Sequence, residues 1–240
     1  MRVQLDSLGL NYKFFPAIDG RAEEHLQFTN YRDEFCLEAW RRPLTPGEIG
    51  CFASHYLLWQ RCVERNEPMI VMEDDVDISP RFVEAIKLLP GLDYLGYLRL
   101  SGINFPRNKI ALTKLPAEWE IVRFLERPMG TQCYALFPGS ADKFIKNSAR
   151  WTLPVDNYMD SFWLHNIPCI GLAPFQVSIP RTIASTISSD GVSPSTQMRT
   201  RVWRPKRFLA RGVSNFRHGW GNLEYALGLR KLQVLTDVQP

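Results

Sequence analysis

Four carboxylates lie within five residues of one another, directly after a short apolar segment. The segment at residues 68–72 has the length and composition of a buried strand, and it is followed by Glu73, Asp74, Asp75 and Asp77. Ligands bind outside the carboxyl ends of strands in open α/β sheets, and clustered carboxylates suit a hard cation such as Mn²⁺ or Mg²⁺. Because such close acids repel one another unless a cation offsets them, the sequence predicts a metal-assisted active site. The alternative is an acidic surface turn leading into a helix at Ser79 and Pro80.

Three more aspartates occupy positions at which a side chain could reach the same site. Asp156 and Asp160 follow Pro154, which is expected to open a helix, and their i, i+4 spacing places both on one side of it. Asp19 lies in a turn at residues 16–20 after an expected short strand at residues 12–15. Each has a structural alternative, since aspartate also caps helices and forms Asx turns.

The elements that must position these acids alternate between helices and strands. Thr45, Pro46 and Glu48 form a capping box with proline at the first helical position, which predicts a helix ending at about Asn66. A second helix is expected at residues 82–89, and Ser140 is expected to cap a third that runs to about residue 149. Strands are predicted at residues 69–72, 97–100, 110–112, 121–124, 131–137 and 170–173. This alternation favours an α/β fold with a single mixed, mostly parallel sheet flanked by helices.

Length and composition exclude several classes of protein. At 240 residues and 45% hydrophobic content, the chain can bury one α/β core with a small appendage. It has no apolar run long enough to span a bilayer and no signal peptide, which favours a cytoplasmic protein. The cysteines are odd in number and lack a CxxC pair, so they are expected to be reduced core residues with neither disulfide nor zinc roles: Cys36, Cys51, Cys62, Cys133 and Cys169.

The charge is distributed unevenly along the chain. Residues 1–184 are predicted to form the catalytic domain, and the Ser-, Thr- and Gly-rich residues 185–198 a flexible loop. Residues 199–240 hold nine lysines or arginines against two acids, interleaved with aromatic residues, within a chain of net charge +4. We expect this helical tail to contact an anionic membrane surface or a phosphorylated glycan; the alternative is an ordinary amphipathic helix packed on the domain. Nucleic acid is not expected, since no binding motif accompanies the charge.

Five stretches of the chain, in order, resemble glycosyltransferase family 25, which includes bacterial lipopolysaccharide and lipooligosaccharide glycosyltransferases. They are residues 14–20 (FFPAIDG), 44–55 (LTPGEIGCFASH), 71–76 (VMEDDV), 130–136 (GTQCYAL) and 154–156 (PVD). The resemblance implies a GT-A type nucleotide-diphospho-sugar transferase fold, a UDP-hexose donor (often UDP-galactose), a divalent cation and inversion at the anomeric carbon. Family members begin with a further strand and helix, so the first strand is expected to be missing and donor affinity to be affected.

The resemblance also implies roles for individual residues. Asp75, with Glu73 or Asp74, would hold the Mn²⁺ or Mg²⁺ that bridges the donor diphosphate, and Asp74 could instead meet the ribose. Asp156 would be the catalytic base, with Asp160 orienting the acceptor or exchanging roles with it. The donor would contact Asp19, Ser54, His55, Thr131 and Gln132. A hydrogen-bonded structural role is the alternative for His55.

The implied function is the transfer of a hexose, expected to be galactose, from a UDP-sugar to a lipid-linked lipopolysaccharide or lipooligosaccharide glycan. Such an enzyme would be cytoplasmic and peripheral at the inner membrane. Two alternatives belong to other classes. Residues 75–79 (DVDIS) loosely fit the start of haloacid dehalogenase-like phosphatases, in which the first aspartate is a nucleophile. The chain could also be a non-catalytic relative that binds glycan or membrane.

Overall fold

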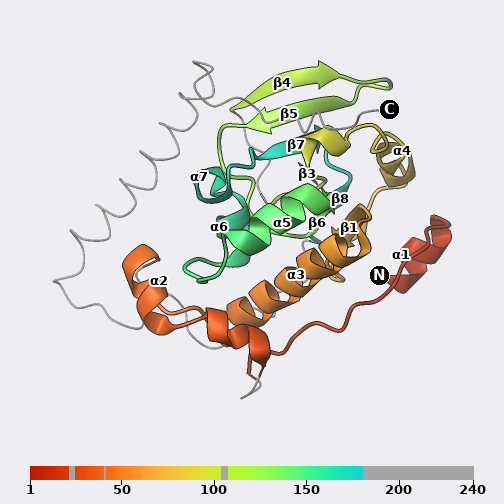
Figure 1. Cartoon of the computed structure of the whole chain (residues 1–240). Helices are drawn as coiled ribbons and strands as arrows, with labels where there is room; N and C mark the ends of the chain where they lie inside the picture. The colour runs from red at the N-terminus through yellow and green to blue at the C-terminus, as the bar shows by residue number, and fades with distance from the viewer. Residues whose placement is uncertain (22–24, 41, 104–107, 181–240) are drawn as a thin grey trace.

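The computed structural model describes residues 1–21, 25–40, 42–103 and 108–180 (Figure 1). The expected flexible loop at residues 185–198 and the basic segment at residues 199–240 lie outside these ranges, so both stay predictions. Within the described residues, no helix is long and apolar enough to cross a membrane.

The described strands form a six-stranded mixed sheet in the order β1-β6-β3-β7-β5-β4. Their bounds are β1 (Met69–Met72), β3 (Tyr97–Arg99), β4 (Lys109–Lys114), β5 (Glu120–Phe124), β6 (Cys133–Leu136) and β7 (Ile170–Ala173). A separate antiparallel pair joins β2 (Asp77–Ile78) to β8 (Val177–Ser178). The predicted α/β class and mixed sheet are therefore confirmed.

The prediction that the sheet is mostly parallel is wrong for the described strands. Only β3 and β7 are parallel neighbours, and the other four pairings are antiparallel. The physical reason lies in the connections. Strands β1, β3 and β7 each follow a helix and run in the same direction, whereas β5 follows the β4 hairpin and β6 follows a loop. Strand β5 returns antiparallel to β4 through a hairpin. Strand β6 runs in the same direction as β5 and inserts between β1 and β3, antiparallel to both.

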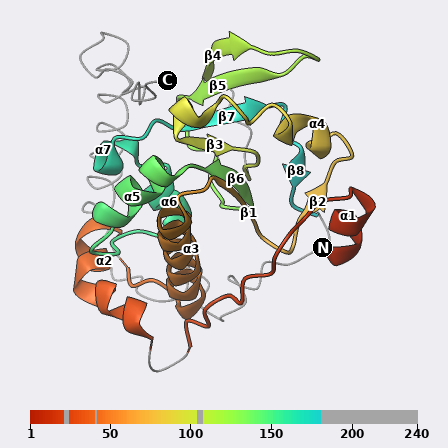
Figure 2. The same cartoon turned by 45° about the vertical axis from the view of Figure 1, so that its right-hand side comes forward.

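The helices are mostly short. Their bounds are α1 (Arg2–Ser7), α2 (Asp33–Ala39), α3 (Pro46–Arg65), α4 (Phe82–Ile86), α5 (Pro138–Lys146), α6 (Val155–Met159) and α7 (Phe162–His165), with 3₁₀ turns η1 (Leu26–Asn30) and η2 (Asp93–Leu95). The views in Figures 1 and 2 place α3, α5 and α6 over one face of the sheet, with α4 and the β2–β8 pair towards the other. Both sheet faces are therefore covered.

Alternation along the strands divides the core between the two faces. On β6, Tyr134 and Leu136 belong to an aromatic cluster beneath α3 and α5 that includes Trp59. Cys133 and Ala135 point the other way, into an aliphatic cluster that includes Leu98 of β3. Successive residues of a strand face opposite sides of a sheet, so every residue of β6 is buried. The central strands are thereby fixed in register on both faces.

Helix α3, which carries part of the candidate site, begins as the sequence predicts. The Thr45 hydroxyl accepts from the Glu48 N–H at 3.2 Å, and the Glu48 carboxylate accepts from the Thr45 N–H at 2.8 Å. Arg42 also holds Glu48, at 2.7 Å through each carboxylate oxygen. The helix ends at Asn66 in the left-handed conformation, with φ of 51°. These caps fix which residues of α3 face the sheet.

Two local predictions are wrong. Residues 12–15 form no strand in the described structure, because this segment has no ladder partner there. Ser140 does not cap α5; the helix begins at Pro138, whose fixed φ and missing N–H suit a first helical position.

The five cysteines are unpaired thiols, as predicted. Four are buried, whereas Cys51 has intermediate exposure. This difference singles out Cys51, which lies on α3 among the candidate site residues described below.

Candidate active site

The acids at residues 73–75 lie beside the start of β6, because β1 and β6 are antiparallel neighbours. Met72 pairs with Cys133, and the next N–H along, that of Glu73, donates to the Gln132 carbonyl at 2.9 Å. The carboxyl end of β1 and the amino end of β6 therefore meet at one edge of the sheet. This pairing brings Thr131 and Gln132 next to the acids, as the sequence analysis expected of a single site.

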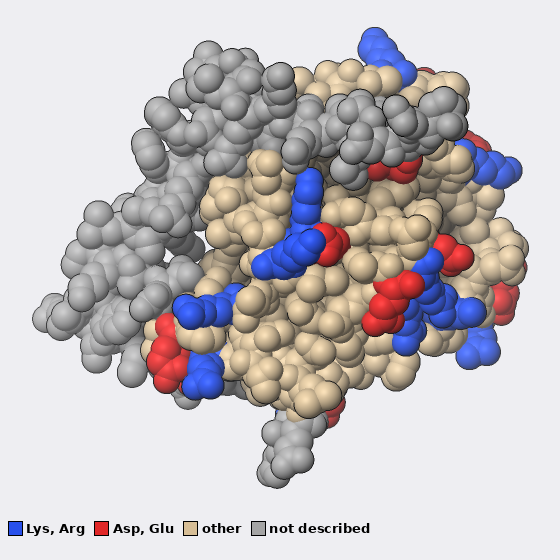
Figure 3. Space-filling view, in the orientation of Figure 1, with Lys and Arg blue, Asp and Glu red and all other residues tan. Residues whose placement is uncertain are grey.

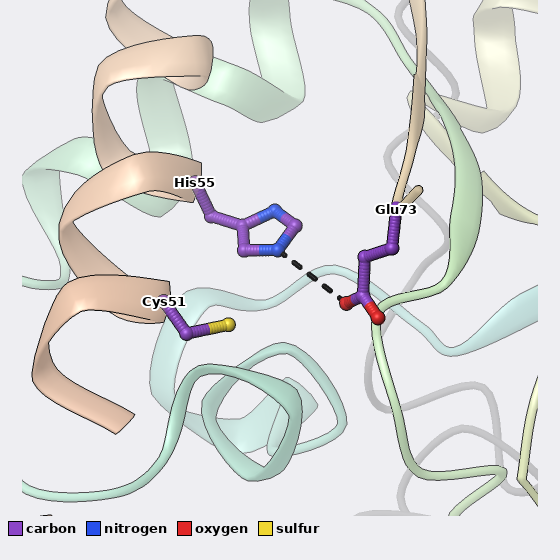
Figure 4. Close-up of side chains that lie close together, drawn as sticks. All are labelled: Cys51, His55 and Glu73. Atoms are coloured by element: carbon purple, nitrogen blue, oxygen red, sulfur yellow. Dashed lines mark ion pairs between the residues drawn. The ribbon is translucent and has the colours of Figure 1, made fainter. Parts of the chain in front are cut away.

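Helix α3 supplies two more side chains to this edge. Cys51 and His55 lie one helical turn apart, and Figure 4 shows the thiol and imidazole pointing into the space in front of Glu73. The sulfur, a ring nitrogen and a carboxylate oxygen of these three residues all lie within 4.8 Å of one another. His55 Nε2 is 3.8 Å from Glu73 Oε1. Cys51 was expected to be an ordinary core thiol, so sequence reasoning missed its place here.

Aromatic and hydroxyl groups hold His55 and Glu73 from behind. His55 Nδ1 lies 2.8 Å from the Tyr134 hydroxyl oxygen, which also accepts from Trp59 Nε1 at 3.1 Å. The Thr131 hydroxyl donates to Glu73 Oε1. Burial alone would raise the pKa of Glu73, but the contacts with His55 and Thr131 outweigh it and lower that pKa. Glu73 is therefore held as a carboxylate.

The other two acids of the motif face outward. Asp74 is exposed and Asp75 is half-buried. Burial and then the charges of Glu73 and Asp74 raise the pKa of Asp75. Within the described residues, no lysine or arginine forms an ion pair with any of these three acids. Glu73 is stabilised by His55 and Thr131, whereas Asp74 and Asp75 have no lysine or arginine counter-ion among the described residues.

A second pair of acids closes the turn that leads into Thr131. Met129 and Gly130 both have positive φ, 58° and 76°. Asp160 Oδ2 accepts from the Met129 N–H at 3.0 Å, and Asp156 Oδ2 accepts from the Gly130 N–H at 3.2 Å. Two carboxylates from α6 and its C-terminal end thus hold the backbone of this strained turn.

Asp160 is also half of a buried ion pair. Its Oδ1 accepts from Arg99 Nη2 at 2.5 Å, and Arg99 donates through Nη1 to the Gly130 carbonyl. Asp160 and Arg99 are each 1% exposed. Burial raises the pKa of Asp160, whereas the charge of Arg99 and the Met129 N–H lower it. Sequence reasoning missed Arg99, although a charged residue inside the apolar strand at residues 97–100 was a visible signal.

Asp156 differs from Asp160 in its exposure. It is half-buried, and its Oδ1 accepts from both the backbone N–H and the side-chain amide of Asn157, at 2.7 and 3.0 Å. The charges of Glu73 and Asp156 both raise the pKa of Cys51, after burial as the largest cause. Carboxylates separated by more than 80 positions in the sequence therefore lie close enough to act on one thiol.

The remaining residues that were expected to contact the sugar donor fall into two groups. Gln132 is 7% exposed, its Oε1 has no hydrogen-bond partner, and a Cβ at Gly130 would lie 2.2 Å from that atom. By contrast, the Ser54 hydroxyl is engaged away from the acids, accepting from the Ile18 N–H and donating to the Gly50 carbonyl, both at 2.8 Å.

Asp19 is exposed and lies beside the first turns of α3. Its Oδ1 accepts from the Arg21 N–H at 2.9 Å, which is the Asx turn considered as its structural alternative. The structure thus brings together Glu73, Asp74, Asp75, His55, Thr131, Gln132 and Asp156, with Asp160 behind the turn. Ser54 and Asp19 instead shape the segment that packs on α3.

An acid-lined edge built from α3, β1, β6 and α6 is the kind of site that the family resemblance implies. The sequence model of glycosyltransferase family 25, described as an LPS biosynthesis protein family, matches residues 1–159. The chain therefore belongs to glycosyltransferase family 25.

Curated relatives support the same family. A glycosyltransferase 25 family member from Aedes aegypti is 42% identical over 86 residues, covering 32% of this chain and 14% of the relative. Human procollagen galactosyltransferase 2 is 36% identical over 94 residues, covering 35% of this chain and 14% of the relative. The human inactive glycosyltransferase 25 family member 3 is 34% identical over 130 residues, covering 49% of this chain and 20% of the relative. The chain thus aligns with a fifth or less of the length of these relatives.

Proposed function

We propose that this chain is a metal-assisted, inverting glycosyltransferase of the GT-A type. It would move a hexose, galactose, from a UDP-sugar to a lipopolysaccharide or lipooligosaccharide glycan acceptor. Family membership and the LPS description of the family support the reaction class and the acceptor. A relative named as a galactosyltransferase supports the hexose. The family match over residues 1–159 also argues against the phosphatase alternative.

The convergence of acids from two distant parts of the chain is the observation that carries this proposal. Transfer with inversion requires a group that neutralises charge on the departing diphosphate and a base opposite to it. Residues 73–75 and Asp156 supply candidates for both, and the charges of Glu73 and Asp156 both raise the pKa of Cys51. Two carboxylate environments at one edge of a sheet suit an in-line displacement.

The outward-facing acids fit a hard divalent cation. Asp74 and Asp75 offer oxygen ligands only, which is the donor set that Mn²⁺ and Mg²⁺ prefer. The raised pKa of Asp75 reflects burial and like charge that a cation would offset. Bound there, the cation would supply charge neutralisation at the UDP leaving group. We assign this role to Asp75 first and to Asp74 second, since Glu73 faces His55 and Thr131.

Asp156 is the proposed catalytic base. The Gly130 N–H and Asn157 fix the direction of its carboxylate, while its half-buried position leaves it able to meet an acceptor. It would take the proton of the acceptor hydroxyl as that oxygen bonds to the anomeric carbon and the bond to UDP breaks. Asp160 is engaged by Arg99 and Met129, so we propose that it positions the turn and does not touch the acceptor.

The donor would lie against the amino end of β6. The unpartnered Oε1 of Gln132 can accept a hydrogen bond from a sugar hydroxyl, and Gly130 keeps the backbone close to it. Thr131 and His55 would fix the position of Glu73 beside this part of the donor site. Asp19 would reach the uridine or ribose from the segment that packs on α3, with Ser54 holding that segment.

A donor screen tests the proposal directly. Purified protein is incubated with UDP-galactose, UDP-glucose, GDP-mannose and CMP-sialic acid, each with Mn²⁺, with Mg²⁺ or with chelator, and release of the nucleotide is measured. We expect metal-dependent release of UDP, and UDP with Mn²⁺ should raise the melting temperature by linkage. Stabilisation by GDP or CMP but not by UDP would contradict the donor assignment. UDP binding without turnover on any acceptor would favour the non-catalytic alternative, as in the relative named inactive.

We further propose that the basic residues 199–240 bring the enzyme to an anionic membrane surface that carries its acceptor. The support is the sequence: nine cations against two acids, with Trp203 and Trp220 among them. The face of the domain in Figure 3 shows acidic and basic side chains interspersed and no broad basic area among its described residues. Co-sedimentation with anionic vesicles at low salt should be lost when Arg204, Lys206, Arg207 and Arg211 become Gln. Absence of binding by the parent protein would contradict the idea.

A further inference from the structure

The side chains of Cys51, His55 and Glu73 form a compact group of three different ligand types. A thiol, an imidazole and a carboxylate each contribute one atom to a space in which all three lie within 4.8 Å of one another (Figure 4). Atoms bound 2.0–2.3 Å from a tetrahedral zinc ion lie roughly 3.3–3.6 Å apart. Small rotations of these side chains would therefore bring the three atoms to ligand distances.

The separation between His55 and Glu73 favours a site that takes a cation between them. Nε2 and Oε1 are 3.8 Å apart, which is too long for a hydrogen bond. A buried imidazole N–H aimed at a carboxylate would be expected to close to about 2.8 Å. The observed distance lies closer to that between two ligands of one metal ion than to that of a donor and an acceptor.

The groups behind His55 hold its Nδ1 and leave Nε2 directed towards Glu73. The Tyr134 oxygen accepts from the Trp59 indole N–H and lies 2.8 Å from His55 Nδ1, a contact in which either group can donate according to the tautomer. If Nδ1 carries the proton and donates to that oxygen, Nε2 presents a lone pair towards Glu73 and Cys51. A metal-binding histidine usually has its second nitrogen held by such a partner.

Glu73 is oriented in the same manner. The Thr131 hydroxyl donates to Oε1, and the backbone N–H of Glu73 is fixed by the Gln132 carbonyl. Two of the three ligands thus have second partners that fix their direction, which is the arrangement that distinguishes a prepared site from an accidental cluster. A thiolate, a carboxylate and a neutral imidazole together carry the charge that one divalent cation balances.

We propose that Cys51, His55 and Glu73 bind a zinc-type divalent ion, with a fourth position open to water or ligand. Sulfur and imidazole donors select zinc, cobalt or iron over the magnesium class. This site differs from the oxygen-only pair of Asp74 and Asp75 in its sulfur and nitrogen donors, although Glu73 is adjacent to Asp74 in the sequence. The sequence shows no zinc spacing, because the third ligand, Glu73, directly follows β1 and only the fold brings it to the helical pair Cys51 and His55.

Cobalt spectroscopy tests the site without donor or acceptor. Chelator-treated full-length protein is titrated with Co²⁺, and its absorption is recorded in the near ultraviolet and visible. We expect one equivalent to produce a sulfur-to-cobalt charge-transfer band with intense tetrahedral visible bands, abolished by one equivalent of Zn²⁺ but not by excess Mg²⁺. Cys51→Ser should lose the charge-transfer band. Cys62→Ser should keep it, because Cys62 lies on the same helix but points to the Glu67 and Leu136 carbonyls.

Two further measurements keep the proposal falsifiable if Cys51→Ser folds poorly. His55→Gln should weaken Co²⁺ binding at least tenfold. In the unmodified protein, Zn²⁺ should slow alkylation of Cys51 by a maleimide, mapped by mass spectrometry, because the other four cysteines are buried. Absence of the charge-transfer band in the parent, or an equal band in a folded Cys51→Ser, would overturn the site. Since UDP release is a separate readout, failure of this proposal and failure of the transferase proposal are distinguishable.

Discussion

Two groups of acids lie near the same turn of the chain, and the protein treats them in opposite ways. Asp156 and Asp160 hold the Met129–Gly130 backbone, and Asp160 is ion-paired with buried Arg99. Asp74 and Asp75 follow β1 with no lysine or arginine paired to them in the described part of the chain. The first group has its partners within the fold, whereas the second has no lysine or arginine partner among the described residues.

This difference separates positioning from chemistry. A buried carboxylate with two or more fixed donors can hold a backbone turn but has little capacity left for a substrate. An exposed or half-exposed cluster of like charge is unfavourable by itself, so its free energy improves when a cation binds. Asp156 lies between these extremes, since it holds Gly130 and is half-buried. The comparison therefore predicts different losses for each acid.

Neutralising the solvent-facing group should have the largest effect on activity. Asp75→Asn is expected to lower transfer by about three orders of magnitude, because metal-assisted charge stabilisation contributes several kcal/mol. Its melting temperature should stay the same or rise, since one repulsive charge is removed. Initial rates at saturating UDP-sugar, with and without Mn²⁺, measure the loss. The control is Asp77→Asn, an exposed acid on β2, which should keep near-normal activity; an inactive Asp77→Asn would shift the assignment.

Breaking the partnered group should have the largest effect on stability. Arg99→Met leaves Asp160 buried without its counter-ion and is expected to cost about 3–5 kcal/mol of unfolding free energy. Urea denaturation measures this loss. Lys146→Met removes an exposed pair with Asp142 and should change stability by less than about 1 kcal/mol. Adding Asp160→Asn to Arg99→Met should restore part of the stability; no recovery would show that the unpaired Asp160 charge does not account for the loss.

The intermediate acid should separate binding from catalysis. Asp156→Asn is expected to reduce transfer by roughly two orders of magnitude, the scale of lost general-base assistance. UDP-dependent thermal stabilisation should persist, because the base meets the acceptor and not the diphosphate. Asp160→Asn should lower the rate less and the melting temperature more. If Asp160→Asn is inactive while Asp156→Asn turns over normally, the two roles must be exchanged.

His165 is a buried group outside both groups of acids, and its protonation is expected to give the smallest effect on stability. This effect tests how unfavourable a charge is inside this core. Burial lowers the pKa of His165 to about 3, below its ordinary 6.5. The folded state therefore binds its proton less tightly than the unfolded state, so stability is fully present above pH 6.5 and falls as the pH drops towards 3. The loss is about 1.4 kcal/mol per pH unit. Urea denaturation at pH 7.0 and 5.5 should show a smaller decrease in His165→Gln than in the parent.

Local signals predicted many elements of the fold correctly. The capping box at Thr45 fixed the start of α3, and the apolar runs gave the bounds of β1 and β7 as the structure has them. The strand order could not be predicted, because it depends on the tertiary contacts that decide which strands become neighbours. The expected strand at residues 12–15 shows the same limit, since a strand pattern needs a neighbouring ladder to become a strand.

The candidate site shows where sequence reasoning stops. The acids at residues 73–75 stood out because they follow a buried strand, and Asp156 because it matched a family motif. Arg99 and Cys51 were missed because their roles depend on partners 61 and 22 positions away. A buried arginine within a strand and a cysteine one turn from a histidine are weak signals in one sequence, and tertiary contacts alone give them meaning.

The contact between Gly20 and Gly50 has a consequence for how this protein can vary. A Cβ on Gly20 would lie 1.6 Å from the Pro46 carbonyl oxygen, and one on Gly50 would lie 2.3 Å from the Ile18 carbonyl oxygen. Here two backbones touch without side chains between them, so a side chain at either glycine would displace the backbone of the other segment. In a library of single substitutions scored for stability, Gly20 and Gly50 should both be intolerant, whereas exposed positions of residues 12–21 should tolerate change. We expect related sequences to keep both glycines while other positions of the two segments vary.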